Sequence, residues 1–204
     1  MIRNIVFDMG QVLIRFDREY FLRRLGVSEE DRRRLMEEVF LSLEWARLDW
    51  GSMTEEEAVD SVCTRLPARL HDAAAKLITQ WDRPILPVEG MHGLIEELKA
   101  AGYGIYLLSN ASRRQHDYWP RVPGHGLFDG TLISADIGFV KPEQEIYRAF
   151  TERFALQPEE CFFVDDVPAN VEGACRWGMG GAVFYGDVPK LREDMRRAGI
   201  AIGV

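Results

Sequence analysis

Close to its start the chain has a short apolar run, residues 4–7, which stops at the carboxylate of Asp8. A short apolar run of this kind is typical of a strand that is buried on both faces of a parallel sheet. Similar runs at residues 103–108, 161–164 and 181–185 are separated by segments with helical spacing of apolar residues. Strands that alternate with helices imply right-handed crossovers, so we expect an α/β fold with a doubly wound parallel sheet.

A helical insertion separates the first strand from the rest of this pattern. Residues 16–86 contain only helical patterns, including a capping box that begins at Thr54. Prolines stiffen residues 83–87, after which strands and helices alternate again. We therefore predict two domains: a core that consists of residues 1–15 and 87–204, and a helical domain of residues 16–86 that is a candidate lid.

Composition excludes several classes of function. The net charge is −8, which opposes non-specific binding to nucleic acid because such binding needs a basic face. No apolar run approaches the ~20 residues that span a bilayer, so we expect no membrane partner. The three cysteines lack metal-type spacing, and the first strand begins too early for a signal peptide, so we expect a cytoplasmic protein. Whether it is a monomer or a homodimer is left open.

Polar side chains end three of the predicted strands. Asp8 follows the first strand, Ser109 and Asn110 follow the second, and Asp165 and Asp166 follow a later one. Because parallel strands point the same way, these side chains should converge at one edge of the sheet although they lie far apart in sequence. The sequence therefore predicts a polar site at that edge.

The carboxylates of this site predict a bound cation. Carboxylates that meet in a partly desolvated cleft repel each other, so they need a positive charge to stay ionised. Oxygen ligands select a hard ion, and Mg²⁺ is held by a few carboxylates or carbonyls together with waters and substrate phosphate. Lys141 follows an apolar run and precedes Pro142, which fixes the local backbone. Its ammonium is a candidate partner for an acid or a phosphate.

Four short segments resemble, in order and spacing, the four motifs of the haloacid dehalogenase-like hydrolase superfamily. They are Phe7-Asp8-Met9-Gly10, Leu108-Ser109-Asn110, Lys141-Pro142 and Val164-Asp165-Asp166. The resemblance covers essentially the whole chain and implies a Rossmann-like hydrolase core whose helical insertion is a four-helix cap. A closer likeness is to bacterial sugar-phosphate phosphatases that act on α-D-glucose 1-phosphate, through residues 8–12, Ser109-Asn110, Arg113, His116 and Trp119-Pro120.

The resemblance implies a role for each polar residue in phosphoryl transfer. Asp8 would attack phosphorus and form an aspartyl-phosphate, which suits a carboxylate that is ionised at neutral pH. Ser109 and Asn110 would donate hydrogen bonds to the transferring phosphoryl oxygens. Lys141 would neutralise charge on the phosphoryl group and on the intermediate.

The resemblance also implies a set of metal ligands. Asp8, Asp166 and the carbonyl of Gly10 would hold Mg²⁺, and Asp165 would be either an outer ligand or the partner of Lys141. The function implied is a Mg²⁺-dependent phosphomonoesterase that acts on a small phosphorylated metabolite, such as the sugar phosphate glucose 1-phosphate.

Gly10 departs from the pattern of most phosphatases in this superfamily. These enzymes carry an aspartate two residues after the nucleophile, which acts as general acid and base and is typically worth ~10²–10⁴ in rate. Either a positioned water or another acid must then serve; Asp17, Glu44, Asp49 and His116 are the candidate acids, and the sequence does not rank them. Two alternative functions stay open: a metal-independent 2-haloacid dehalogenase, and a non-catalytic protein that binds a phosphorylated metabolite.

Overall fold

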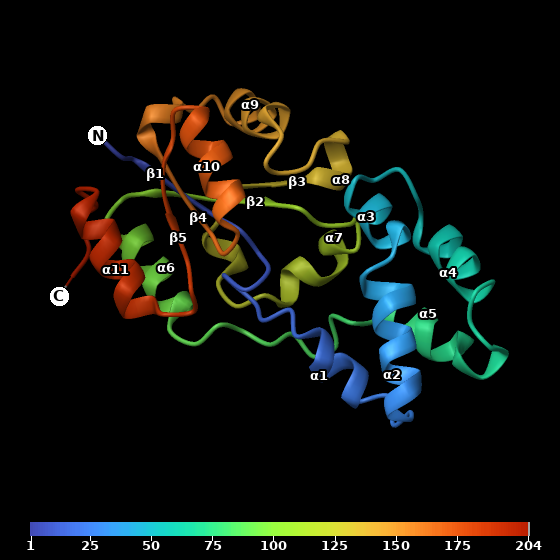
Figure 1. Ribbon diagram of the computed structural model, residues 1–204. Helices are drawn as coiled ribbons and strands as arrows, with labels where there is room; N and C mark the ends of the chain where they lie inside the picture. Colours follow the sequence, from blue (N-terminus) through green and yellow to red (C-terminus); the bar gives the residue numbers. More distant parts are fainter. Residues whose placement is uncertain (204) are drawn as a thin grey trace.

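The sheet of this protein consists of five parallel strands within residues 1–203, the part of the chain that the computed structural model describes (Figure 1). The strands are β1 (Asn4–Phe7), β2 (Gly104–Ser109), β3 (Gly130–Ile133), β4 (Cys161–Asp165) and β5 (Gly180–Val183). Their order is β3-β2-β1-β4-β5, and every neighbouring pair is parallel, so β1 lies at the centre. The predicted doubly wound parallel sheet is confirmed, although β5 ends at Val183, before the end of the predicted run.

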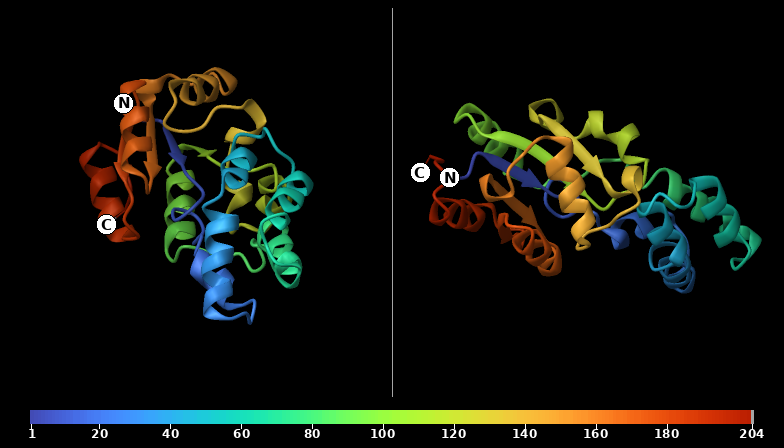
Figure 2. Two further views of the ribbon diagram at one scale, coloured as in Figure 1. Left: turned by 45° about the vertical axis from the view of Figure 1, so that its right-hand side comes forward. Right: turned by 90° about the horizontal axis from the view of Figure 1, so that it is seen from above.

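Helices cover both faces of the sheet because side chains alternate across each strand. In β1, Ile5 and Phe7 pack into a cluster with α6 and α11 on one face, and Val6 packs with α9 and α10 on the other. The four helices, which Figure 1 and Figure 2 show in two layers, are α6 (Met91–Ala100), α9 (Gln144–Arg153), α10 (Pro168–Arg176) and α11 (Val188–Arg197). Each large apolar side chain buried here contributes roughly 1.5–3 kcal/mol, which fixes the strand ends that carry the site.

Residues 16–86, hereafter the cap, are helical as predicted and lie beside the sheet (Figure 1). The short α1 leads into four further helices, and the bounds are α1 (Arg18–Arg23), α2 (Glu29–Leu35), α3 (Leu43–Asp49), α4 (Glu55–Cys63) and α5 (His71–Thr79). Their apolar side chains, such as Leu35 and Ala74, form a cluster separate from those of the sheet. This separate cluster supports the division into core and cap, which stays a prediction.

The two links between cap and core run side by side. The Arg15 N–H donates to the Leu86 carbonyl at 2.7 Å, and the Val88 N–H donates to the Leu13 carbonyl at 3.0 Å. The chain therefore leaves and re-enters the core at one place, which brings the start of the cap close to the end of β1.

Short helical segments make up most of the remaining connections. They are α7 (Gln115–Tyr118) and α8 (Ser134–Ile137), the π-helical turn Met36–Phe40 that continues α2, a 3₁₀ turn at each of Ala68–Leu70, Trp119–Arg121 and His125–Leu127, and another at Pro158–Glu160. Of the helices within residues 1–203, none has the length and apolar character needed to cross a membrane.

Glu44 holds two cap helices together and gives a prediction about acid stability. Its carboxylate accepts hydrogen bonds from Arg65 at 2.8 and 3.0 Å and from Ser61 at 2.7 Å. The Arg65 hydrogen bond lowers the pKa of Glu44 to about 2 against the opposing effect of burial. Because this folded-state pKa lies below the unfolded value, the stabilisation should be complete above about pH 4.5 and lost as the pH falls toward 2.

We expect Glu44→Gln to lower the free energy of unfolding by about 1–3 kcal/mol at neutral pH, and by progressively less toward pH 3. Urea denaturation across this range measures the difference. Glu30→Gln is the matched control, because Glu30 is 75% exposed and its distance of 3.7 Å from Arg34 is too long for a hydrogen bond. A deficit that does not change with pH would show that the charge of Glu44 is not what stabilises the cap.

Candidate active site

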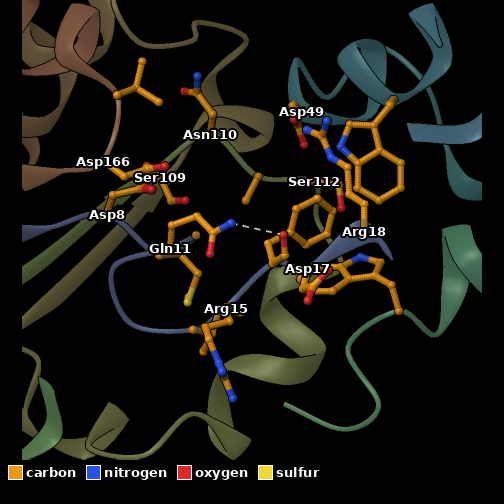
Figure 3. A pocket seen from close by; sticks show the side chains of 18 of the residues that line it. Asp8, Gln11, Arg15, Asp17, Arg18, Asp49, Ser109, Asn110, Ser112 and Asp166 are labelled. Atoms are coloured by element: carbon orange, nitrogen blue, oxygen red, sulfur yellow. Dashed lines mark hydrogen bonds between the residues drawn. The ribbon is translucent and has the colours of Figure 1, made fainter. Parts of the chain in front are cut away.

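The carboxyl ends of β1, β2 and β4 bring the predicted polar residues together. Phe7 pairs with Leu107 on one side and with Val164 on the other, so the residues that follow leave the sheet at the same edge. Asp8, Asp165 and Asp166 each offer a carboxylate oxygen, and these three oxygens lie within 4.8 Å of one another. Figure 3 shows Asp8, Ser109 and Asp166 on one side of a pocket. The geometry thus places the predicted cluster as the sequence indicated.

Lys141 reaches this cluster from the loop between α8 and α9. Its ammonium donates to Asp8 Oδ1 at 2.7 Å, to Asp165 Oδ2 at 2.6 Å and to the Leu108 carbonyl at 3.1 Å. Burial alone would lower the pKa of Lys141, but the charges of Asp8 and Asp165 outweigh it and raise this pKa above its ordinary value. A positive charge therefore lies between the two carboxylates. All three N–H groups of the Lys141 ammonium donate hydrogen bonds.

Asn110 holds the backbone of Lys141 in place. The Lys141 N–H donates to Asn110 Oδ1 at 2.7 Å, and Asn110 Nδ2 donates to the Lys141 carbonyl at 3.0 Å. Sequence reasoning did not foresee this pairing, because the two residues are far apart in the chain. The hydrogen bond from Asn110 to a phosphoryl oxygen stays a prediction, as does that of Ser109, whose buried side chain lines the same pocket.

Asp165 and Asp166 have different surroundings, which bears on a question that the sequence left open. Asp165 is fully buried, and besides Lys141 it accepts hydrogen bonds from the Val167 N–H at 2.8 Å and from Asn170 Nδ2 at 3.1 Å. Asp166 lines the pocket, and burial together with the charge of Asp165 raises its pKa. Asp165 is thus the partner of Lys141, and Asp166 is the carboxylate of this pair that lines the pocket.

The donor set fits a Mg²⁺ ion. Burial raises the pKa of Asp8 and the nearby Asp165 adds to this effect, while Lys141 opposes it. A divalent cation would remove the cost of keeping Asp8 and Asp166 ionised side by side. All the side-chain donors are carboxylate oxygens, which a hard cation prefers. Gly10, whose carbonyl is the remaining predicted ligand, lines the same pocket.

The pocket is a cavity of about 790 Å³ that lies between the core and the cap. Its cap side includes Phe16, Trp45 and Trp81, with the Phe16 ring centroid 4.8 Å from that of Trp81 and 5.6 Å from that of Trp45. Asp49, which the sequence offered only as an unranked candidate, lines the same cavity. The i, i+4 spacing of Trp45 and Asp49 on α3 is a signal that would have placed them on one helix face.

The fold and the site together define an α/β protein whose parallel strands carry a carboxylate cluster and a buried lysine at their carboxyl ends. Residues 2–176 match the family model described as haloacid dehalogenase-like hydrolase, and the chain belongs to this family. The family resemblance and the hydrolase class predicted from the four motifs are therefore confirmed.

Several relatives of known activity are phosphatases. The chain is 27% identical over 187 residues to the sesquiterpene phosphatase astK of Aspergillus oryzae, covering 86% of each protein. It is 25% identical over 184 residues to the D-ribitol-5-phosphate phosphatase of Bacteroides thetaiotaomicron, covering 84% of this chain and 86% of that protein. It is also 24% identical over 189 residues, 91% of its length, to the drimenol cyclase drtB of Aspergillus calidoustus, but spans only 34% of that longer protein.

Solved structures share the fold. A haloacid dehalogenase family enzyme from Bacteroides thetaiotaomicron, solved with magnesium and inorganic phosphate, superposes with a TM-score of 0.71 at 24% identity, covering 94% of this chain and 99% of that one. The L-2-haloacid dehalogenase of Xanthobacter autotrophicus superposes with a TM-score of 0.67 at 18% identity, covering 98% of this chain and 85% of that one. At these identities the likenesses describe the fold alone.

Proposed function

We propose that this chain is a Mg²⁺-dependent phosphomonoesterase that acts on a small phosphorylated metabolite through an aspartyl-phosphate on Asp8. The observation that carries the proposal is the arrangement of three carboxylates within 4.8 Å, one of which, Asp8, is held by the Lys141 ammonium. A carboxylate nucleophile beside a site for a divalent cation suits transfer of a dianionic phosphoryl group. The phosphatase relatives support the same reaction class.

Each residue of the site then has a part in the reaction. Asp8 attacks phosphorus with one oxygen while Lys141 holds the other at 2.7 Å and fixes the direction of attack. Asp165 keeps Lys141 in position through its own 2.6 Å contact. Asp8, Asp166 and the Gly10 carbonyl would hold Mg²⁺, which when bound neutralises charge on the phosphoryl oxygens.

The cavity supports a small organic phosphate as substrate. Besides its aromatic side chains, the cap side presents the charged residues Asp17, Arg18 and Glu19. Such a wall suits a ligand with both apolar and hydroxyl-bearing surface, and a sugar phosphate such as glucose 1-phosphate is the substrate we propose within this class. A cytoplasmic location and a monomeric or homodimeric state remain predictions.

A release assay tests the proposal against its alternatives. The wild-type chain is incubated with a panel of phosphate monoesters and, separately, with 2-chloropropionate, each with Mg²⁺ or with a chelator in excess. We expect phosphate release that needs Mg²⁺, because the carboxylates require the cation to bind a phosphate dianion. Chloride release that is insensitive to chelator would identify a dehalogenase. Binding of phosphate esters without any turnover would identify a non-catalytic binding protein.

A further inference from the structure

The proposed reaction needs a proton carrier, and Gly10 has no side chain to supply one. Three of the four candidates from the sequence are placed unsuitably. Asp17 is exposed and caps α1 by accepting from the Tyr20 N–H at 2.9 Å. Glu44 is tied to Arg65, as described above, and does not line the cavity. His116 is also outside the cavity lining, with its side chain 54% exposed beside Asp136.

Asp49 lines the same cavity as Asp8 and Asp166, as Asp17 does, but it is half-buried there, whereas Asp17 is exposed and its carboxylate caps α1. It is the last residue of α3, and Figure 3 shows it beside Arg18 and Ser112, across the pocket from Asp8. A phosphoryl group attached to Asp8 would therefore have Asp49 on its far side, where the leaving oxygen departs in an in-line displacement.

The backbone around Asp49 is fixed to the core. Ser134 Oγ donates to the Asp49 carbonyl at 2.5 Å, and Arg113 Nη1 donates to the Gly51 carbonyl at 3.2 Å. Gly51 approaches the core so closely that a Cβ there would lie 2.1 Å from the Ala135 carbonyl oxygen. These contacts attach the end of α3 to the core, although it belongs to the cap.

We propose that Asp49 is the catalytic general acid and base of this enzyme and supplies from the cap what Gly10 lacks. The proposal rests on the proposed function. In the first step Asp8 bonds to phosphorus, the ester P–O bond breaks, and the leaving oxygen takes the proton of Asp49. In the second step water gives a proton to the Asp49 carboxylate and bonds to phosphorus. The bond from phosphorus to Asp8 then breaks and releases phosphate, so Asp49 ends protonated as it began.

The surroundings of Asp49 suit a group that both gives and accepts a proton. Burial raises the pKa of Asp49 to about 7, and the charge of Asp8 adds to the effect. The Ser112 backbone, Arg18 and Lys141 act in the opposite direction. Tyr118, which also interacts with Asp49, has a pKa that burial raises far above neutrality, so it stays uncharged. A general acid is most effective when its pKa lies near the working pH.

The first test is Asp49→Asn, which keeps the shape of the side chain and removes its titration. We expect kcat/KM for an alkyl phosphate to fall by about 10²–10³-fold, because an alkoxide needs a proton to leave. An aryl phosphate, whose phenolate leaves without one, should still phosphorylate Asp8, so the variant should give a burst of phenol followed by slow turnover. Asp60→Asn, an exposed carboxylate on α4, is the matched control and should behave as wild type.

A rescue experiment separates catalysis from structural support. Gly10 has room for a side chain, since a Cβ there would meet nothing closer than Asp8 Oδ2 at 3.9 Å. We expect Gly10→Asp to restore alkyl phosphate turnover to Asp49→Asn by tenfold or more. The wild-type rate should also fall as the pH rises above about 7, because Asp49 then loses its proton. The pH–rate profile of Asp49→Asn should lack this decrease.

The outcomes distinguish this inference from the proposed function. A wild-type chain without phosphatase activity would refute the proposed function itself. An active wild type whose Asp49→Asn variant hydrolyses alkyl and aryl phosphates with equal losses, without a burst and without rescue by Gly10→Asp, would overturn the role of Asp49 alone.

Discussion

Asp8→Asn should abolish phosphate release by this protein. Asparagine has the shape of aspartate, and its Oδ1 can still accept the hydrogen bond that Lys141 donates at 2.7 Å. Its uncharged oxygen is a poor nucleophile, so no aspartyl-phosphate forms and the two-step route is closed. We expect kcat to fall by at least about 10⁴-fold, which corresponds to about 5.4 kcal/mol in activation free energy. Steady-state assays measure the loss of turnover. The mass of acid-quenched protein shows whether a phosphoryl group is attached to it.

Asp8→Asn should also change how the protein responds to Mg²⁺. The raised pKa of Asp8 means that the fold disfavours the ionised form of this carboxyl group when no metal ion is bound. Removing this charge should leave the melting temperature in chelator no lower than that of wild type, while Mg²⁺ should stabilise the variant less because a ligand is lost. A variant that keeps activity within tenfold of wild type would exclude Asp8 as the nucleophile.

Lys141→Met should have a large effect on stability as well as on activity. The Lys141 side chain is 1% exposed, and its removal would leave Asp8 and Asp165 buried without their cation. Breaking a buried ion pair on one side typically costs about 3–5 kcal/mol, and loss of its charge from the phosphoryl site should slow turnover by about 10²–10³-fold. The stability loss should be smaller near pH 5 than near pH 7, because orphaned buried carboxylates have raised pKa values and become protonated on acidification.

Lys99→Met is the matched control for this substitution. The Lys99 ammonium also pairs with a carboxylate, that of Asp129, at 2.6 Å, but the two side chains are 34% and 40% exposed. Solvent screens such a pair, so its loss should change the free energy of unfolding by about 1 kcal/mol or less. Urea denaturation in chelator measures the free energy of unfolding of both variants. Equal losses would show that burial of the Lys141 charge does not add to its contribution to stability.

Much of the fold followed from local patterns in the sequence. The apolar run at residues 4–7 became the central strand, and the capping box at Thr54 begins α4 with both of its hydrogen bonds formed. Such patterns can be recognised in a sequence because residues close together in the chain determine helix caps and the alternation of apolar side chains. The length of β5 was less well predicted, because the end of a strand depends on the partner strand beside it.

The groups of the candidate site could be named from the sequence: Asp8 after one buried strand, the acidic pair Asp165-Asp166 after another, and Lys141, whose position the family motifs mark. The arrangement of these groups could be found only in the folded chain. Asp165 binds Lys141 while Asp166 faces the pocket, and Ser134 fixes the backbone of Asp49 from 85 residues away. The physical reason is that the pKa and the hydrogen-bond partners of a side chain depend on burial and on groups brought near by folding, which no local pattern specifies.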